Sequence, residues 1–349
     1  MSVERNFEPQ VVTSLFRRHI VVTRLVTSFV TSLWAVAVAV LYPNGRASSS
    51  LHSKSRRARI RRKSIGRLST AIVLQVLGFE VDFVNSVQLC SHTGYKHFKG
   101  QVLGSEDLKV LVDGLRSNKL LDDYTHLLTG YIGSKSFLEE VLSVVKELKE
   151  NCPGLVYVCD PVMGDNGQLY VPADLKAVYR EQFVPIADIL TPNQFELEIL
   201  SEMEIKTEQD ALKAIASLQK RGAKDVVLSS SDFPGKEPNT IVALGRSRSG
   251  KSFRIEIPRL PVSFVGSGDV FACLLLAWSS QHADNLQLAC EQTVASLQAI
   301  LKRTAESAKA KVGDSEPTPR DLELRLVQSK NDIETPPTGN QPKSETVDF

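Results

Sequence analysis

Short apolar runs alternate with amphipathic stretches along most of the chain, starting at about Ala71. Apolar runs that are bounded by Gly, Pro, Asn, Asp or Ser are typical of buried strands. Between them, residues 136–149 place Leu138, Val141 and Val145 on one side of a helix. The alternation predicts an α/β fold with a mostly parallel sheet covered on both faces. The predicted strands are residues 80–87, 126–132, 155–162, 188–192 and 225–230.

The second half of the chain adds helices and a sheet edge. Residues 207–222 and 286–302 have the helical spacing of apolar positions that predicts amphipathic helices. Residues 240–244 and 251–257 resemble an antiparallel pair at the edge of the sheet. The last stretch, residues 334–349, is rich in Pro, Thr, Lys and Glu, and we expect it to be disordered.

Charge divides the chain into two unlike parts. Residues 1–70 hold 13 Lys and Arg but only two acids, whereas the other 279 residues hold 29 basic and 38 acidic side chains. The near-neutral total therefore describes neither part, and it does not indicate nucleic-acid binding by the folded body. We expect residues 1–70 to lie outside the fold and residues 71–333 to form one domain.

The basic N-terminal part has two features that resemble targeting signals. Residues 25–42 carry no charge and follow Arg17, Arg18 and Arg24, as a signal anchor would, although their many Thr and Ser residues argue against a membrane span. Residues 53–67 form a basic run that resembles a surface or targeting patch. A membrane-anchored, non-catalytic protein remains an alternative at this point.

The five cysteines are scattered and show no CxxC spacing, which argues against a disulfide framework and against a zinc site. They fit a reducing compartment, and we expect a cytoplasmic protein.

The sequence FVGSGDVF at residues 264–271 predicts a tight glycine turn that opens a buried helix. Such a turn directs backbone N–H groups and the positive end of a helix dipole at one point, which suits a phosphate. Asp269 in this turn is a carboxylate that can take a proton from an attacking hydroxyl group, and phosphoryl transfer needs this pairing. Alternatively, Gly266 and Gly268 only shape the turn, and Asp269 only favours the helix start.

Polar side chains follow three of the predicted strands, where ligands bind in open α/β sheets. Carboxylates at such positions can hold Mg²⁺, which bridges to phosphates. Turn formation, helix capping and strand termination use the same residue types, so each group alone is a weak signal. These residues are Asp160 and Asp165 after one strand, Thr191, Asn193 and Glu196 after the next, and Ser229 and Ser230 after the last.

Two small clusters near early strands suit a flat heteroaromatic ring. His92-Thr93-Gly94-Tyr95 and Thr129-Gly130-Tyr131 offer an aromatic face and a hydroxyl group. By composition alone they are equally well explained as ordinary loop residues.

Taken together and in this order, VYVCDPVMGD, LTPNQFE, VVLSSSD and FVGSGDVF resemble the pyridoxal kinase branch of the ribokinase-like kinases. The resemblance covers roughly residues 74–333, and it includes NSVQLCSHTGYKHFKGQVL and LELRLVQSKNDIE. FVGSGD alone is shared by ribokinase-like kinases in general.

The resemblance implies a three-layer α/β/α fold, a homodimer, and transfer of the γ-phosphate of ATP to the 5′-hydroxymethyl group of pyridoxal, pyridoxine or pyridoxamine. It further implies Mg²⁺ and a monovalent cation, K⁺ or Na⁺. A kinase for another hydroxymethyl heterocycle, such as the thiamine pyrimidine precursor, is the alternative within the superfamily. The roles carried over are Asp269 as catalytic base; Gly266, Ser267 and Gly268 as anion hole; Asp160, Asn193, Ser229, Ser230, Phe264, Gly266 and Ser267 at ATP; Asp160, Asp165, Thr191 and Glu196 at the cations; and Thr93, Tyr131 and Asp269 at the vitamin.

The chain departs from the family at its N-terminus, because relatives begin with a sheet strand and loop of the form SIQSHVVRGYVGN. No such segment precedes Leu74, so the first family strand is missing or replaced. Residues 51–66, LHSKSRRARIRRKSIG, can be encoded by a nucleotide string that, read one base later, gives SIQSHVVRGYVGNRS. We therefore hypothesise that the chain before about Leu74 comes from a frame-shifted or misassembled reading. For the chain as written, we expect unpaired strand neighbours, poor solubility and little activity with pyridoxal.

Overall fold

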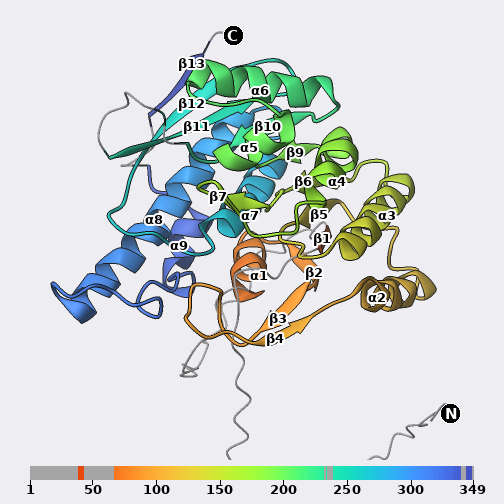
Figure 1. Ribbon diagram of the computed structural model, residues 1–349, viewed down its shortest axis with the longest axis horizontal. Helices are drawn as coiled ribbons and strands as arrows, with labels where there is room; N and C mark the ends of the chain where they lie inside the picture. Colours follow the sequence, from red (N-terminus) through yellow and green to blue (C-terminus); the bar gives the residue numbers. More distant parts are fainter. Residues whose placement is uncertain (1–37, 43–66, 232, 234–238, 339–342, 348–349) are drawn as a thin grey trace, which may run out of the picture.

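The computed structural model describes residues 38–42, 67–231, 233, 239–338 and 343–347. Its centre is a nine-stranded sheet with the order β13-β12-β11-β10-β9-β6-β5-β1-β2 (Figure 1). The described residues also form two small antiparallel hairpins, β3 (Val87–Leu89) with β4 (Gly100–Val102) and β7 (Gly164–Asp165) with β8 (Gln168–Leu169). The strands of the large sheet are β1 (Val38–Tyr42), β2 (Glu80–Val84), β5 (His126–Thr129), β6 (Val156–Cys159), β9 (Ile189–Leu190), β10 (Asp225–Leu228), β11 (Thr240–Arg246), β12 (Ser252–Pro258) and β13 (Lys343–Val347).

The middle of this sheet is parallel, as the apolar runs predicted. β5, β6, β9 and β10 pair side by side in parallel, whereas β10–β11, β11–β12 and β12–β13 are antiparallel. The predicted antiparallel pair is confirmed as the hairpin β11–β12. Its predicted place at the edge of the sheet was wrong, because β13 pairs with β12 on the outer side. The carboxyl ends of the parallel strands meet at one edge of the sheet, where a ligand site is expected.

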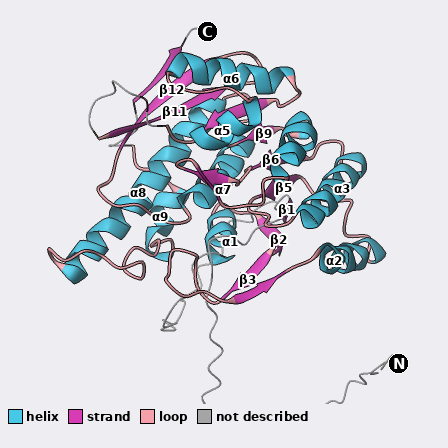
Figure 2. Cartoon of the chain, in the orientation of Figure 1, coloured by secondary structure: helices cyan, strands magenta, loops and turns pink. Residues whose placement is uncertain are grey.

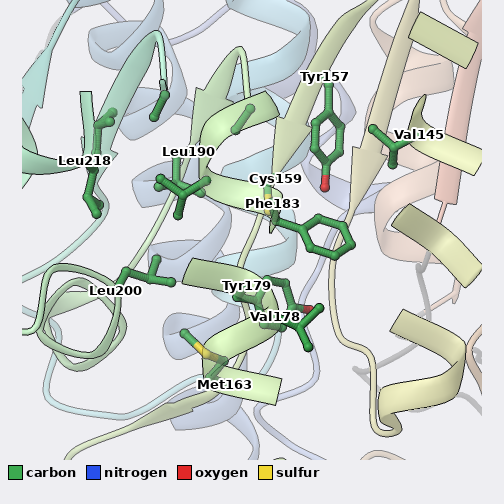
Figure 3. Packing of buried hydrophobic residues seen from close by; sticks show 14 of the residues in the cluster. Val145, Tyr157, Cys159, Met163, Val178, Tyr179, Phe183, Leu190, Leu200 and Leu218 are labelled. Carbon is green, nitrogen blue, oxygen red and sulfur yellow. The ribbon is translucent and has the colours of Figure 1, made fainter. Parts of the chain in front are cut away.

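One face of the sheet is covered by α2 (Ser105–Ser117), α3 (Lys135–Asn151), α4 (Leu175–Val178), α5 (Gln194–Ser201) and α6 (Glu208–Lys220) (Figures 1 and 2). Apolar residues of these helices pack against inward-facing strand residues such as Tyr157 and Leu190 in one core (Figure 3). Ser134, Asn193 and Thr207 cap α3, α5 and α6 with their side-chain oxygens. These helix starts are local features that the sequence specifies directly.

The other face is covered by α1 (Arg67–Val76), α7 (Ser267–Gln281), α8 (Leu286–Val312) and α9 (Lys330–Glu334) (Figure 1). Residues 270–278 of α7 are all buried, so this helix has no polar face over that length. A helix that is apolar on all sides lies inside the core. The sheet lies between the two helical layers, which confirms the three-layer α/β/α architecture.

We had expected residues 1–70 to lie outside the fold, but residues 38–42 form strand β1 of the large sheet. β1 inserts between β2 and β5 and pairs antiparallel with both, with Ala39 opposite Phe83 on one side and Leu128 on the other. The apolar run 38–42 thus replaces the missing first strand, and our expectation of unpaired neighbours along β1 was wrong. The rest of the uncharged stretch, residues 25–37, and the basic run up to residue 66 lie outside the described residues.

The C-terminal stretch also contributes a strand that we had expected to be disordered. β13 extends the sheet beyond β12, and Glu345 of β13 accepts a hydrogen bond of 3.1 Å from buried Arg254. Arg254 also pairs with Glu208 and Glu256, so one guanidinium group joins α6, β12 and β13. No helix in the described part of the chain is long and apolar enough to cross a membrane.

Candidate active site

Side chains from three strand ends surround one cavity of about 530 Å³. The cavity lies at the carboxyl edge of the parallel strands, where β6, β9 and β10 end. The structure brings together there all of the residues predicted for the phosphates and cations. These are Asp160, Asp165, Thr191, Asn193, Glu196, Ser229, Ser230, Phe264, Gly266, Ser267, Gly268 and Asp269.

Asp160 and Glu196 are the buried acids of this cavity, with exposed fractions of 6% and 3%. Thr191 donates its hydroxyl hydrogen to Asp160 Oδ1 over 3.1 Å. Glu196 accepts from the amides of Met163 and Asn193, each over 2.9 Å, and so holds the strand end and the start of α5 together. Glu196 is therefore also a structural residue, through the capping box that its sequence spacing indicated.

Burial raises the pKa values of the carboxyl groups in this cavity, and the charge of Asp160 adds to the rise for its two neighbours. Burial raises the pKa of Asp160 to about 7, although the hydrogen bond from Thr191 opposes the rise. Burial and the charge of Asp160 raise the pKa of Glu196, and the same two causes raise that of Asp269. The cavity thus has an excess of negative potential that a bound cation would relieve.

The predicted glycine turn opens α7 directly beside these acids. Gly266 has φ +90°, in the left-handed region that favours glycine, and it is the N-cap of α7. No side chain caps this helix, so its first amides remain available to an anion. Asp269 lies in the first turn of α7 and lines the same cavity.

One wall of the cavity is apolar, and sequence analysis did not identify it. Ile241 and Ile257 come from the hairpin β11–β12, and Leu297 and Leu301 come from α8. An apolar slot beside a phosphate site suits a flat nucleobase. In the sequence these positions are indistinguishable from ordinary core residues.

A second cavity, of about 540 Å³, holds the two residues that were predicted for the vitamin ring. Thr93 and Tyr131 line it together with Val87, Phe98 and Val102, which were not predicted. Tyr170 and Val265 line both cavities, so the second cavity adjoins the first. A ring bound here would have its substituent next to the glycine turn.

The acids fit a magnesium ion that is shared with a nucleotide. Within the described residues, no group of three His, Cys, Asp or Glu side chains is arranged to hold a metal ion. Mg²⁺ needs only one or two carboxylates when phosphates and water complete its shell, and Asp160 with exposed Asp165 supplies that number. Both oxygens of Glu196 already accept backbone hydrogen bonds, so a contact through water suits this residue better.

Known proteins of similar sequence point to one family. A family model described as Phosphomethylpyrimidine kinase matches residues 121–315. A pyridoxal kinase from Sus scrofa is 47% identical over 306 residues, which span 84% of this chain and 95% of that protein. A pyridoxal kinase from Homo sapiens is 48% identical, over 78% of this chain and 91% of that protein. The chain belongs to the pyridoxal kinase family.

Solved structures agree with this membership. Pyridoxal kinase from Leishmania donovani in complex with ADP and pyridoxamine is 32% identical and superposes with a TM-score of 0.74. The match covers 81% of this chain and 95% of that chain. The chain is therefore a kinase with the ribokinase-like fold, as the sequence motifs indicated.

Proposed function

We propose that this chain transfers the γ-phosphoryl group of ATP to the 5′-hydroxymethyl group of pyridoxal, pyridoxine or pyridoxamine. The observation that carries the proposal is the adjacency of two cavities. One has the glycine turn and the buried acids, and the other has Thr93 and Tyr131. The complexes of the Leishmania donovani relative with ADP and pyridoxamine, and with ADP and pyridoxine, support this choice of ligands.

In the proposed reaction, Asp269 accepts the proton of the substrate hydroxyl group. The 5′ oxygen forms a bond to the γ-phosphorus, the bond from that phosphorus to the bridging oxygen breaks, and ADP leaves. The amides of Gly266, Ser267 and Gly268 bind the charged oxygens of the transferring group. Burial and the charge of Asp160 raise the pKa of Asp269, and a carboxylate with a raised pKa is a stronger base for this proton.

The remaining residues would hold the nucleotide and its cations. Asn193, Ser229, Ser230 and Phe264 would contact ATP. Asp160 and Asp165, with Thr191 and Glu196 behind them, would hold Mg²⁺ and a monovalent cation, K⁺ or Na⁺. Bound Mg²⁺ supplies positive charge that screens the phosphates.

The proposal is tested by the release of ADP from ATP, with pyridoxal or with a hydroxymethyl pyrimidine as acceptor. We expect release with pyridoxal and none above background with the pyrimidine, and the reverse result would favour the thiamine-pathway alternative. Asp269→Asn should slow release at least about a hundredfold and leave nucleotide binding intact.

The altered N-terminus calls for a second arm of this test. Residues 51–66 are replaced by the other-frame reading, SIQSHVVRGYVGNRS, and both chains are assayed side by side. Since the family serine at the ring is absent from the chain as written, we expect weak turnover that the replacement restores. Equal turnover by the two chains would contradict this expectation, and sequencing of the transcript would test the frame-shift hypothesis itself.

We further propose a cytoplasmic homodimer. All five cysteines lie in the described residues and none forms a disulfide, which suits a reducing compartment. Light scattering of the purified chain tests the dimer, and fractionation of cells tests the compartment.

A further inference from the structure

The loop that carries Thr93 is a tight turn packed against the glycine turn. The amide of Tyr95 donates to the carbonyl oxygen of His92 over 3.1 Å, and the amide of Gly94 donates to His92 Nδ1 over 3.1 Å. A Cβ atom added at Gly94 would lie 2.9 Å from His92 Nδ1 and 3.2 Å from Val265 Cγ2. Gly94 of the Thr93 turn is thus packed closely between the imidazole ring of His92 and Val265, which lines both cavities.

A long-range hydrogen bond fastens this turn to the C-terminal part of the chain. The hydroxyl group of Tyr95 donates to Glu323 Oε1 over 2.7 Å, across 228 residues of sequence. The ring of Tyr95 also meets the ring of His92 edge-on, with centroids 4.5 Å apart. His92 itself is only 4% exposed. The Tyr95–Glu323 bond therefore holds both ends of the turn, one directly and one through the imidazole ring.

Glu323 lies in a segment that has contacts on both of its sides. Asp321 accepts from the amide and the hydroxyl of Thr318, and Lys311 of α8 pairs with it over 3.1 Å. On the other side of Glu323, the side chain of Leu324 is 4% exposed and packs in the core with α7. Glu323 is therefore a fixed point to which a loop can be fastened.

The chain that follows the Thr93 turn pairs back onto β3 in a two-stranded sheet that is separate from the large one, but its side chains are largely exposed. Phe98 and Val102, which line the same ring cavity, are 46% and 63% exposed. Exposed side chains with few buried contacts give a segment little local stability. The position of Thr93 relative to the cavity therefore depends on the fastened end of the loop.

We propose that the Tyr95–Glu323 hydrogen bond sets affinity for the vitamin ring, and that Tyr95 and Glu323 are positioning residues that act through Thr93. The inference rests on the proposed function, since it takes the ring cavity as the vitamin site. Neither residue needs to touch the reacting atoms. Loss of the bond should weaken vitamin binding and leave nucleotide binding unchanged.

The test is a double-mutant cycle on the full chain, with Tyr95→Phe, Glu323→Ala and the two combined. Calorimetry gives the Kd of pyridoxine and, separately, of ADP with Mg²⁺. Glu323→Gln keeps an acceptor for the tyrosine hydroxyl group and serves as the conservative variant. Tyr124→Phe is the matched control, because Tyr124 donates to Asp82 over 3.2 Å just before β5, at the opposite edge of the sheet.

Each single variant should raise the Kd of pyridoxine about tenfold, the size expected for a hydrogen bond to a charged acceptor. The double variant should add little to either single one, since both remove the same bond. Glu323→Gln should stay close to the unsubstituted chain, and Tyr124→Phe should lower stability without changing the Kd. In turnover, the KM for pyridoxal should rise while kcat and the KM for ATP stay the same.

An unchanged pyridoxine Kd in Tyr95→Phe overturns the inference, as does an equal loss of ADP affinity, which would indicate general damage to the fold. The cycle is also run in the chain with residues 51–66 replaced by SIQSHVVRGYVGNRS, because we expect the chain as written to bind the vitamin weakly. If neither unsubstituted chain binds pyridoxine while both bind ADP, the proposed substrate fails, and the positioning role fails with it. That outcome differs from failure of the inference alone, in which an unsubstituted chain still binds pyridoxine.

Discussion

The buried carboxylates of the candidate site should lower the stability of the ligand-free chain at neutral pH, and Asp160→Asn tests this. The pKa of Asp160 is raised from 3.8 to about 7. At a pH between about 4 and 7, Asp160 still holds its proton in the folded state but has released it in the unfolded state. Stability therefore falls as the pH rises from about 4 to 7, and it stays low above that window.

The size of the effect follows from the shift in pKa. One pKa unit corresponds to about 1.4 kcal/mol, so the shift amounts to at most about 4 kcal/mol at pH 8. An asparagine keeps the acceptor for Thr191 and carries no charge. We expect Asp160→Asn to raise the melting temperature at pH 8 by up to about 8 °C, at roughly 2 °C per kcal/mol. At pH 4 the variant and the unsubstituted chain should melt together.

The assay is thermal unfolding at a series of pH values without nucleotide or metal. Asp188→Asn is the control with opposite sign. Burial opposes ionisation of Asp188, but Lys149, Lys224 and the amide of Tyr157 hydrogen-bond to it and hold its pKa below the ordinary value. Its contribution is present at neutral pH and is lost as the pH falls through its low folded-state pKa, so Asp188→Asn should lower the melting temperature at pH 8. If Asp160→Asn is also destabilising at pH 8, the reasoning about the cost of burying the Asp160 charge is wrong.

Three further substitutions test other parts of the structure. Asp269→Asn should reduce kcat at least a hundredfold, the usual contribution of a general base, with the Kd of ATP unchanged, as measured by ADP release and calorimetry. Gly266→Ala should cost about 1–2 kcal/mol of stability in urea unfolding and also reduce kcat, because alanine is strained at φ +90° and the α7 amides would shift. Arg254→Met leaves three partly exposed acids, Glu208, Glu256 and Glu345, without their shared cation and should cost about 1–2 kcal/mol in the same assay, with faster hydrogen exchange in β13.

The central fold was predictable because its elements are specified locally. The predicted strand 155–162 contains β6, and the predicted helix 207–222 contains α6 with its Thr207 cap. Element ends were less well predicted. The helix predicted at 286–302 extends to Val312, because helix-favouring Ala, Lys and Glu residues continue beyond the apolar stripe.

The part of the candidate site that is built from polar sequence motifs was predictable. The part that is built from apolar residues was not, because such residues resemble those of any hydrophobic core. Asp160 directly follows the buried strand β6, and the glycine turn directly precedes the buried helix α7. Packing alone requires neither a carboxylate nor two glycines at these positions, so their presence indicated a site. Ile241 and Leu297 line the same cavity, yet their sequence signal is simply that of an apolar residue. Only the three-dimensional arrangement distinguishes a wall of a cavity from the interior of a core.

The first strand was wrongly placed outside the fold for a different reason. A slot between two strands that run in the same direction requires an extended, apolar segment whose backbone can pair on both sides, and it does not specify which segment fills it. β2 and β5 leave such a slot, and the run VAVLY meets its requirements in the antiparallel direction. Family resemblance assigns the slot to a segment that also carries a ring-contacting serine. The sheet therefore needs any suitable strand at this position, whereas vitamin binding needs a particular one, and so the N-terminal replacement should affect activity more than folding.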